Sequence, residues 1–244
     1  MATVESMDPK PRVAIVSGAS SGIGRATALE LARAGWSVVL VARSAKALEE
    51  VAQQVVALAP QVTAAVEPAD LRDAGLCRDL VRRVDLRFGR IDALANVAGC
   101  VTLQPITQVT PDLWQQTIDT NLSSVVHLTS QAWPVMARTG GVIVNISSMA
   151  SVDPFPGLAI YAAAKAGVNL FTKGIAKEGE AVGLRAVCIA PGAVETPLLR
   201  NLFDVNRFPP SRTLSPESVA QLITGCITGD HVFINGETIL MPSP

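Results

Sequence analysis

Several kinds of residue that carry chemistry are scarce in this chain. Its 244 residues include one tyrosine and two histidines, and aromatic residues make up only 4% of the total. The two histidines, His127 and His231, provide too few ligands or bases for a histidine-centred metal or hydrolase site. We therefore predict no metal site, and a core built mainly from valine, alanine, leucine and isoleucine.

The cysteines are also few and widely separated, at Cys77, Cys100, Cys188 and Cys226. Such spacing does not resemble a metal-binding pair and is typical of reduced thiols in a cytoplasmic protein. The N-terminus lacks the basic and apolar regions of a signal peptide, and no apolar stretch approaches the roughly 18–20 residues that span a bilayer. We expect a cytoplasmic protein without a membrane partner, in which residues 1–10 form a disordered tail.

No charge of one sign dominates the sequence. The 20 lysines and arginines nearly balance the 21 aspartates and glutamates, and the formal net charge is −1. Because there is also no basic run, nucleic acid and anionic membrane surfaces are excluded as expected partners.

What the chain has in abundance is short apolar runs separated by helical stretches. The first run, Arg12–Ser17, is rich in β-branched residues and suits a strand buried on both faces. Similar runs follow at Val38–Val41, Val62–Val66, Ile91–Asn96, Val142–Ile146, Ala186–Ile189 and Val232–Ile234. This alternation predicts an α/β fold, a Rossmann-type doubly wound parallel sheet with helices on both faces. Since no linker or repeat interrupts it, residues 11–244 should form a single domain.

A glycine-rich turn follows the first predicted strand, and a helical stretch begins directly after the turn. Strand, glycine turn and helix in this order are typical of a phosphate-binding loop, because glycines let the backbone N–H groups at the helix start approach a pyrophosphate. We therefore predict that a dinucleotide is held here by Gly18, Ser20, Ser21, Gly22, Ile23 and Gly24.

The only tyrosine, Tyr161, lies four residues before Lys165, so that both side chains project from one face of a helix. A nearby ammonium favours the phenolate and should lower the pKa of the phenol from its usual value of about 10. The phenol would then donate and accept a proton near neutral pH. Because solvated helix faces often show the same spacing, the interpretation depends on the rest of the chain.

The glycine spacing G-x-x-x-G-x-G, together with Tyr161-x-x-x-Lys165, resembles the short-chain dehydrogenase/reductase family in its compact single-domain branch. Further matches follow in the family's order, from Pro11 to about Glu237. They are Asp70-Leu71, Asn96-Val97-Ala98-Gly99, Asn121, Ser148 and the run from Pro191 to Thr196. The chain departs from the family at Ser17, where threonine is usual, and in its short C-terminal region, which leaves the oligomeric state open.

The resemblance implies a role for each matched residue. The implied catalytic set is Asn121, Ser148, Tyr161 and Lys165. In the family the tyrosine moves the proton, the serine stabilises the substrate oxygen, the lysine holds the nicotinamide ribose and the asparagine holds a water. The implied cofactor contacts, besides the glycine turn and the tyrosine–lysine pair, are Asp70, Leu71, Asn96, Ala98, Gly99, Pro191, Gly192, Val194 and Thr196. We interpret Ser147 as a cap or turn residue, because neighbouring strand residues point in opposite directions.

The end of the second predicted strand bears on the choice between NADP and NAD. An NAD-preferring site usually has a carboxylate there, which holds the ribose hydroxyls and would repel a 2′-phosphate. This chain instead has Ala42 followed by Arg43 and Ser44. An arginine fork suits a phosphate dianion, and a serine adds a hydrogen-bond donor. We predict that NADP(H) is preferred and that NAD(H) is the other candidate cofactor.

A long irregular and apolar stretch at about residues 196–215 follows these motifs and is predicted to be a substrate lid. The opposite wall should come from the stretch Met149 to Leu158. Because both stretches carry few charges, a small apolar carbonyl compound or alcohol is the expected substrate. The predicted protein is an NADP(H)-dependent oxidoreductase that interconverts a ketone and a secondary alcohol, as a homodimer or homotetramer. The alternative is a nucleotide-binding sensor with the same fold and no turnover.

Overall fold

Short apolar segments rich in valine, alanine and isoleucine pair side by side in one sheet. In residues 11–231 and 234–244, which this computed structural model describes, the sheet has seven strands. They are β1 (Val13–Ser17), β2 (Ser37–Ala42), β3 (Ala64–Pro68), β4 (Ala93–Asn96), β5 (Gly141–Ile146), β6 (Leu184–Pro191) and β7 (Thr238–Met241). Neighbouring strands run parallel, in the order β3-β2-β1-β4-β5-β6-β7.

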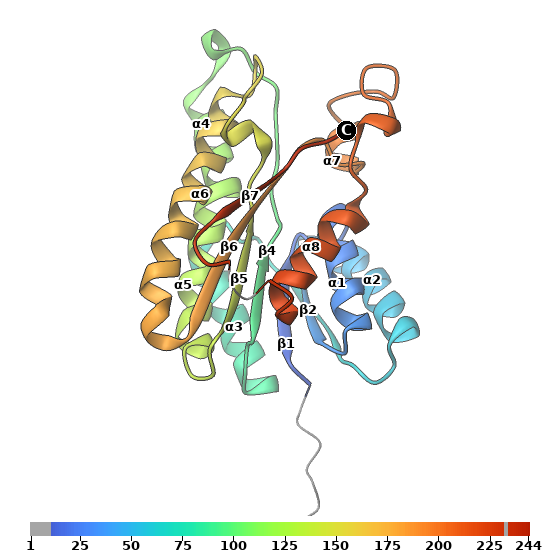
Figure 1. Ribbon diagram of the computed structural model, residues 1–244, viewed down its shortest axis with the longest axis vertical. Coiled ribbons are helices and arrows are strands. Elements are labelled where there is room, and N and C mark those ends of the chain that lie inside the picture. The colour runs from blue at the N-terminus through green and yellow to red at the C-terminus, as the bar shows by residue number, and fades with distance from the viewer. Residues whose placement is uncertain (1–10, 232–233) are drawn as a thin grey trace, which may run out of the picture.

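Helices cover both faces of this sheet (Figure 1). One face carries α1 (Gly22–Arg33), α2 (Ala45–Leu58) and α8 (Pro216–Thr228), and the other carries α3 (Ala74–Phe88), α5 (Ser124–Met136) and α6 (Ala159–Gly179). The shorter helices and helical turns are α4 (Pro111–Ile118), α7 (Pro197–Arg200), η1 (Ile106–Gln108), η2 (Asp119–Ser123), η3 (Met149–Ser151), η4 (Glu180–Val182) and η5 (Pro210–Arg212).

Alternate residues of each strand fill two cores, one on each face of the sheet. In β1, Ala14 and Val16 pack into the core that includes α1 and α8, whereas Val13 and Ile15 pack into the core that includes α3 and α5. All four side chains are buried. Parallel strands covered on both faces need such continuous apolar runs. The predicted fold class, a Rossmann-type doubly wound parallel sheet, is confirmed.

The position of a binding crevice follows from the strand order. The chain moves outward from β1 to β3 on one side, then returns to place β4 on the other side of β1. In open α/β sheets, ligands bind outside the carboxyl ends of the strands at such a switch point. In Figure 1 this is the upper end of the sheet, where the loops after the central strands gather.

Most of the last predicted strand lies outside the described residues. Of the predicted segment Val232–Ile234, residues 232 and 233 lie outside the described residues, and Ile234 belongs to no strand. The last strand is β7, which pairs with β6 so that Ile239 lies beside Ile189. The guanidinium of Arg185 in β6 donates to the Ile234 carbonyl at 3.2 Å and so ties Ile234 to the sheet.

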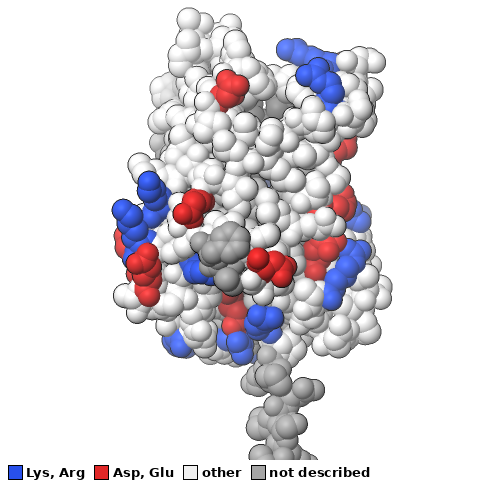
Figure 2. Space-filling model, viewed as in Figure 1, with Lys and Arg blue, Asp and Glu red and all other residues white. Residues whose placement is uncertain are grey.

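The face of the molecule drawn in Figure 2 carries charges of both signs. Figure 2 shows Lys, Arg, Asp and Glu side chains spread over the lower part of one face, with few at the upper end. Among the residues that the structure describes, no helix combines the length and apolar character needed to cross a membrane. The predicted tail, residues 1–10, lies outside the described residues.

Candidate active site

A cleft of about 440 Å³ runs along the upper end of the sheet, and we call it the long cleft. Its walls come from the loops that follow β1, β2, β3 and β4, and from the segment after β6. The predicted cofactor residues in these walls are Gly18, Ser20, Ser21, Gly22, Ile23, Gly24, Arg43, Ser44, Asp70, Leu71, Ala98, Gly99 and Thr196. The fold thus brings these residues, which lie far apart in the sequence, into one elongated site.

The turn at one end of the long cleft requires glycine. Gly18 and Gly22 have φ angles of 67° and 53°, in the left-handed region that residues with a side chain rarely adopt. A Cβ atom on Gly24 would lie 2.3 Å from the carbonyl oxygen of Gly18, so this position has no room for a side chain. The three glycines therefore let α1 begin directly against the turn.

The start of α1 is suited to an anion. Within the described residues no side chain caps this helix, although Ser44 caps α2 and Thr110 caps α4. The first N–H groups of a helix have no partner inside the helix and carry partial positive charge. Because these groups lie beside the glycine turn, the long cleft fits the pyrophosphate of a dinucleotide.

The other end of the long cleft is polar and contains a residue that the sequence interpretation missed. Arg72 lines the cleft and forms an ion pair with Asp70, with 2.6 Å between Nη2 and Oδ2. This hydrogen bond lowers the pKa of Asp70. The Ser44 hydroxyl accepts a hydrogen bond from the Ala47 N–H at 3.3 Å, and Arg43 lies next to it in the cleft wall. This end of the long cleft therefore carries two guanidinium groups and one carboxylate.

A second hollow, of about 300 Å³, adjoins the long cleft, and we call it the apolar pocket. The cleft and the pocket share Ile23, Val97, Gly99, Thr196 and Leu198 in their walls, so the two hollows lie side by side. Most other wall residues are apolar, and they include Val101, Met149, Ala150, Phe155, Leu158, Leu199, Leu202, Phe203 and Phe208. Figure 2 shows the molecule hollowed between its two upper lobes. The predicted wall and the apolar part of the predicted lid thus line one pocket.

Three of the predicted catalytic side chains meet in the apolar pocket. Tyr161 and Lys165 project from α6, and Ser148 follows β5. The Ser148 side chain lies near enough to the Tyr161 phenol to act on its pKa, which it lowers. The Lys165 ammonium lies 5.8 Å from the centre of the Tyr161 ring and donates to the Ile146 carbonyl at 2.9 Å. Gly99, beside Lys165, belongs to both hollows, so these side chains lie where the pocket meets the long cleft.

Burial sets the protonation of Tyr161 and Lys165. Burial raises the pKa of Tyr161 to about 12, against the opposing effect of the Ser148 side chain. Burial also lowers the pKa of Lys165 to about 8. The prediction that the ammonium would bring the phenol below its usual pKa is therefore wrong for this structure, in which Lys165 donates to a backbone carbonyl instead. Tyr161 is a protonated phenol at neutral pH.

Asn121 lies in η2, a π-helical turn, a rare conformation that often marks functional sites. Its amide is buried and engaged, since Oδ1 accepts from the Cys100 N–H at 3.1 Å and Nδ2 donates to the Thr117 carbonyl at 2.9 Å. A Cβ on Gly99 would lie 2.9 Å from this Oδ1 and 3.4 Å from the Lys165 Nζ. Asn121 therefore supports the loop behind the site, and its side chain does not line either hollow.

The interpretation of Ser147 is wrong. Its hydroxyl donates to the carbonyl of Lys165 at 3.0 Å, and so joins the end of β5 to α6. The cap expected of Ser147 is made by Ser148, whose hydroxyl accepts from the Ala150 N–H at 3.1 Å at the start of η3. Ser148 thus combines the local cap with its contact to Tyr161.

Asn96 also differs from its predicted place in the cofactor site. Its side chain is buried in the core and lines neither the long cleft nor the apolar pocket. The amide donates to the Asn145 Oδ1 at 2.8 Å and to the Thr129 hydroxyl at 3.1 Å, and Asn145 donates on to Thr172. Such a buried polar chain needs every member satisfied. It joins β4, β5 and two helices beneath the site.

The segment after β6 brings the remaining predicted residues to the apolar pocket. They are Pro191, Gly192, Val194 and Thr196. The Thr196 hydroxyl accepts from the Leu199 N–H at 3.3 Å and so caps α7. Ser243, which follows β7, also lines the pocket. No motif pointed to Ser243, because the pairing of β7 with β6 brings it there.

A comparison with protein families agrees with this arrangement. Residues 12–206 match the family described as short chain dehydrogenase, and this range includes the glycine turn and the tyrosine–lysine pair. The chain belongs to the short-chain dehydrogenase family.

This short-chain dehydrogenase is similar to its relatives over nearly its whole length. It is 34% identical over 236 residues to acetoacetyl-CoA reductase of Shinella zoogloeoides, covering 93% of this chain and 95% of the relative. It is 32% identical over 235 residues to a 3-oxoacyl-acyl-carrier-protein reductase of Thermotoga maritima, with the same coverage of 93% and 95%. The crystal structure of levodione reductase matches with a TM-score of 0.88 at 27% identity, covering 95% and 96% of the two chains. The protein is an oxidoreductase of CH–OH and C=O groups.

Proposed function

We propose that this short-chain dehydrogenase interconverts a ketone and a secondary alcohol with NADP(H), and that Tyr161 is its general acid and base. The observation that carries the proposal is the junction of the long cleft with the apolar pocket. A dinucleotide in the first and a ketone in the second would meet beside Tyr161. Ser148 and Lys165 line the pocket at the same place.

The residues of the long cleft fit a nicotinamide dinucleotide. The N–H groups at the start of α1 suit its pyrophosphate, Asp70 and Leu71 would lie against the adenine, and Val194 and Thr196 would hold the carboxamide. When bound, the nicotinamide supplies or accepts the hydride. We infer a preference for NADP(H) from the end of β2, where Arg43 follows a neutral residue and offers a charged fork to a 2′-phosphate.

In the direction of reduction, Tyr161 would donate its proton to the carbonyl oxygen of the substrate. Its raised pKa keeps this proton in place at neutral pH. The Ser148 hydroxyl donates to the same oxygen and stabilises the developing negative charge. Oxidation of the alcohol requires the phenolate, so its rate should rise with pH.

Lys165 would hold the nicotinamide ribose and resupply the proton that Tyr161 loses. Burial lowers the pKa of Lys165 to about 8, so its ammonium gives up a proton more readily than an exposed lysine. Asn121 would assist by fixing the loop at Cys100, next to Gly99 and the Lys165 ammonium. In this proposal the four residues form one catalytic unit.

The wall of the apolar pocket favours a small apolar substrate. Among its described residues, Asp153 is the one charged side chain besides Lys165. A carboxylate near the substrate disfavours ligands that carry a carboxylate or phosphate of their own. We propose a small apolar ketone or alcohol, with the segment 196–215 as the lid over it.

A screen with both cofactors tests this function. NADPH or NADH oxidation at 340 nm would be followed with cyclohexanone, acetophenone, 2-octanone, pyruvate and acetoacetyl-CoA. We expect turnover of an apolar ketone, with kcat/KM at least about tenfold higher for NADPH, the scale of one strong charge-assisted contact. The competing function, a nucleotide sensor on the same fold, predicts NADPH binding without turnover of any ketone or alcohol, and that result would overturn the proposal.

We also expect a homodimer or homotetramer in the cytoplasm, as the family resemblance implies. The short C-terminal region lies at the sheet edge beside β6, where β7 is the outermost strand. Light scattering after size-exclusion chromatography measures the assembly directly, and a monomeric mass near 25.5 kDa would contradict this expectation.

A further inference from the structure

The segment between Thr196 and Thr213, which we call the lid segment, leaves the sheet and returns to it at one point. The Leu214 N–H donates to the Ala193 carbonyl at 2.8 Å, and the Glu195 N–H donates to the Leu214 carbonyl at 2.9 Å. Two short helical elements, α7 and η5, lie between these ends. The lid segment is therefore a loop tied at its base, and its interior needs bonds of its own to hold a shape.

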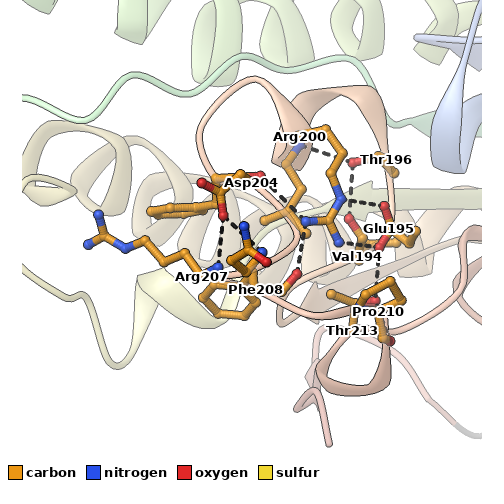
Figure 3. A network of polar contacts seen from close by, with 12 residues as sticks. Val194, Glu195, Thr196, Arg200, Asp204, Arg207, Phe208, Pro210 and Thr213 are labelled. Atoms are coloured by element: carbon orange, nitrogen blue, oxygen red, sulfur yellow. Dashed lines mark hydrogen bonds and ion pairs between the residues drawn. The ribbon is translucent and has the colours of Figure 1, made fainter.

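Local turns hold parts of the lid segment, and the Arg200 guanidinium adds the side-chain bonds that join its base at Glu195 to Phe203 and Phe208. The Arg200 Nε donates to the Glu195 Oε1 at 2.6 Å, and its Nη2 pairs with the other carboxylate oxygen. Its Nη1 donates to the carbonyl of Phe208 at 2.8 Å and to that of Phe203 at 3.4 Å (Figure 3). The Thr213 hydroxyl reaches the same carboxylate at 3.4 Å. A planar fork with several N–H donors makes these contacts together, which a lysine ammonium cannot reproduce.

The two carbonyls belong to the residues whose rings wall the apolar pocket. The rings of Phe203 and Phe208 lie 5.5 Å apart, and Phe155 from the opposite wall lies 6.0 Å from Phe203. Holding the two backbone carbonyls limits how far the backbone that carries these rings can move. The aromatic wall that a substrate would touch therefore depends on a side chain that does not itself line the pocket.

The contacts of Arg200 differ from those of the other lid arginines. The guanidinium groups of Arg207 and Arg212 lie over the rings of Phe203 and Phe208, at 5.0 and 5.9 Å. In the described residues neither forms an ion pair. They touch the same rings without joining them to the base of the loop, and so provide matched controls.

The ion pair of Glu195 and Arg200 also lies next to the long cleft. Glu195 lies between Val194 and Thr196, and Thr196 lines both the long cleft and the apolar pocket. The hydrogen bond with Arg200 lowers the pKa of Glu195, which keeps the carboxylate ionised at neutral pH. Because both side chains are partly exposed, the pair should add little to global stability and act mainly on the loop.

We propose that Arg200 is a positioning residue that links Glu195 to the backbone of Phe203 and Phe208 and thereby holds the aromatic wall of the substrate pocket in place. The inference rests on the proposed function only in taking the apolar pocket as the substrate site. The residue acts on substrate binding through the wall, and it leaves the proton and hydride steps unchanged.

Hydrogen–deuterium exchange of peptides that span residues 198–209 tests the link without a substrate. In Glu195→Gln and Arg200→Lys, exchange of this segment should become about tenfold faster, the scale of one charge-assisted pair with its hydrogen bonds. Exchange in the β5 and β6 peptides should stay unchanged, as should the circular dichroism melting curve. Arg207→Met and Arg212→Met should exchange like the wild type. Equal exchange in all variants would overturn the inference.

Kinetics with the best ketone of the screen then separate positioning from a general structural role. Arg200→Lys should raise KM for the ketone about tenfold, with kcat and the Kd for NADPH within about twofold. The charge swap Glu195→Arg with Arg200→Glu restores an ion pair but leaves the two carbonyls without donors, so it should not restore KM. Restoration by the swap, or a fall in kcat with KM unchanged, would overturn the inference. Failure of the proposed function would give a different result. The wild type would reduce no ketone, while residues 198–209 would still exchange faster in the Glu195 and Arg200 variants than in the wild type.

Discussion

Lys165 should make the folded protein more stable as the pH rises from 7 to 9.5. Its side chain is 3% exposed, and burial lowers the pKa in the folded state to about 8 from the ordinary value of 10.5. Between these two values the unfolded chain binds more protons than the folded one, so the free energy of unfolding increases with pH. The gain in the free energy of unfolding is complete only above the pKa that Lys165 has in the unfolded chain.

The size of the effect follows from the two pKa values. The difference corresponds to a penalty of about 3 kcal/mol for the buried ammonium at pH 7. About 2 kcal/mol of that penalty should disappear by pH 9.5, because the folded lysine is then neutral while most unfolded lysines remain charged. Tyr161 does not interfere in this range, since an unfolded phenol titrates only near pH 10 and burial raises the folded pKa further.

The assay is urea unfolding of the wild type and Lys165→Met at several pH values, at one protein concentration. Methionine preserves length and apolar character but does not titrate, so the slope with pH isolates the lysine. The difference in free energy of unfolding at any single pH does not isolate the lysine charge, because the substitution also removes the donor to the Ile146 carbonyl. We expect the wild type to gain about 2 kcal/mol relative to the variant between pH 7 and 9.5. If the free energies of unfolding of the wild type and the variant changed equally with pH, the conclusion that Lys165 is buried as described would be refuted.

Three further substitutions or titrations test the site. Ser148→Ala should lower kcat by about 10²-fold, as loss of one oxyanion donor does, and Ser147→Ala should lower it much less; steady-state rates that rank the other way contradict this. Ala42→Asp with Arg43→Leu should reverse the ratio of kcat/KM for NADPH and NADH, and an unchanged ratio would remove Arg43 as its cause. In the folded protein the single phenol of Tyr161 should show no tyrosinate absorbance below about pH 11, whereas the urea-unfolded chain should titrate near pH 10. A folded midpoint below 10 would contradict the effect of burial.

Local sequence patterns predicted the sheet because its strands are buried on both faces and therefore consist of unbroken apolar runs. The last strand, β7, was not predicted from an apolar run. β7 is one of the two edge strands and none of its residues is fully buried, so pairing with β6 rather than apolar content defines it. The apolar run that ends at Ile234 looked more like a strand than Thr238–Met241 does.

The sequence predicted those parts of the candidate site whose geometry follows from residue spacing. It did not predict the parts whose geometry depends on packing between distant elements. Lys165 follows Tyr161 by four positions, and this spacing places both side chains on one helix face whatever surrounds it. Whether burial or charge has the larger effect on the pKa of the Tyr161 phenol depends on how other elements pack around it, and the sequence does not show this packing. The same holds for Asn96, whose amide turns into the core, and for Arg72, which belongs to no motif yet lines the cleft.

Single-turnover reduction by Tyr161→Phe tests the central claim most directly. The variant keeps the ring and removes only the hydroxyl, so the walls of the apolar pocket should be preserved. With NADPH bound and the best ketone of the screen in excess, hydride transfer should slow by about 10³-fold, within the range expected for loss of a general acid. The Kd for NADPH, from its fluorescence on binding, should stay within about twofold of the wild type. A variant that binds NADPH normally and still reduces the ketone within tenfold of the wild-type rate would contradict Tyr161 as the proton donor.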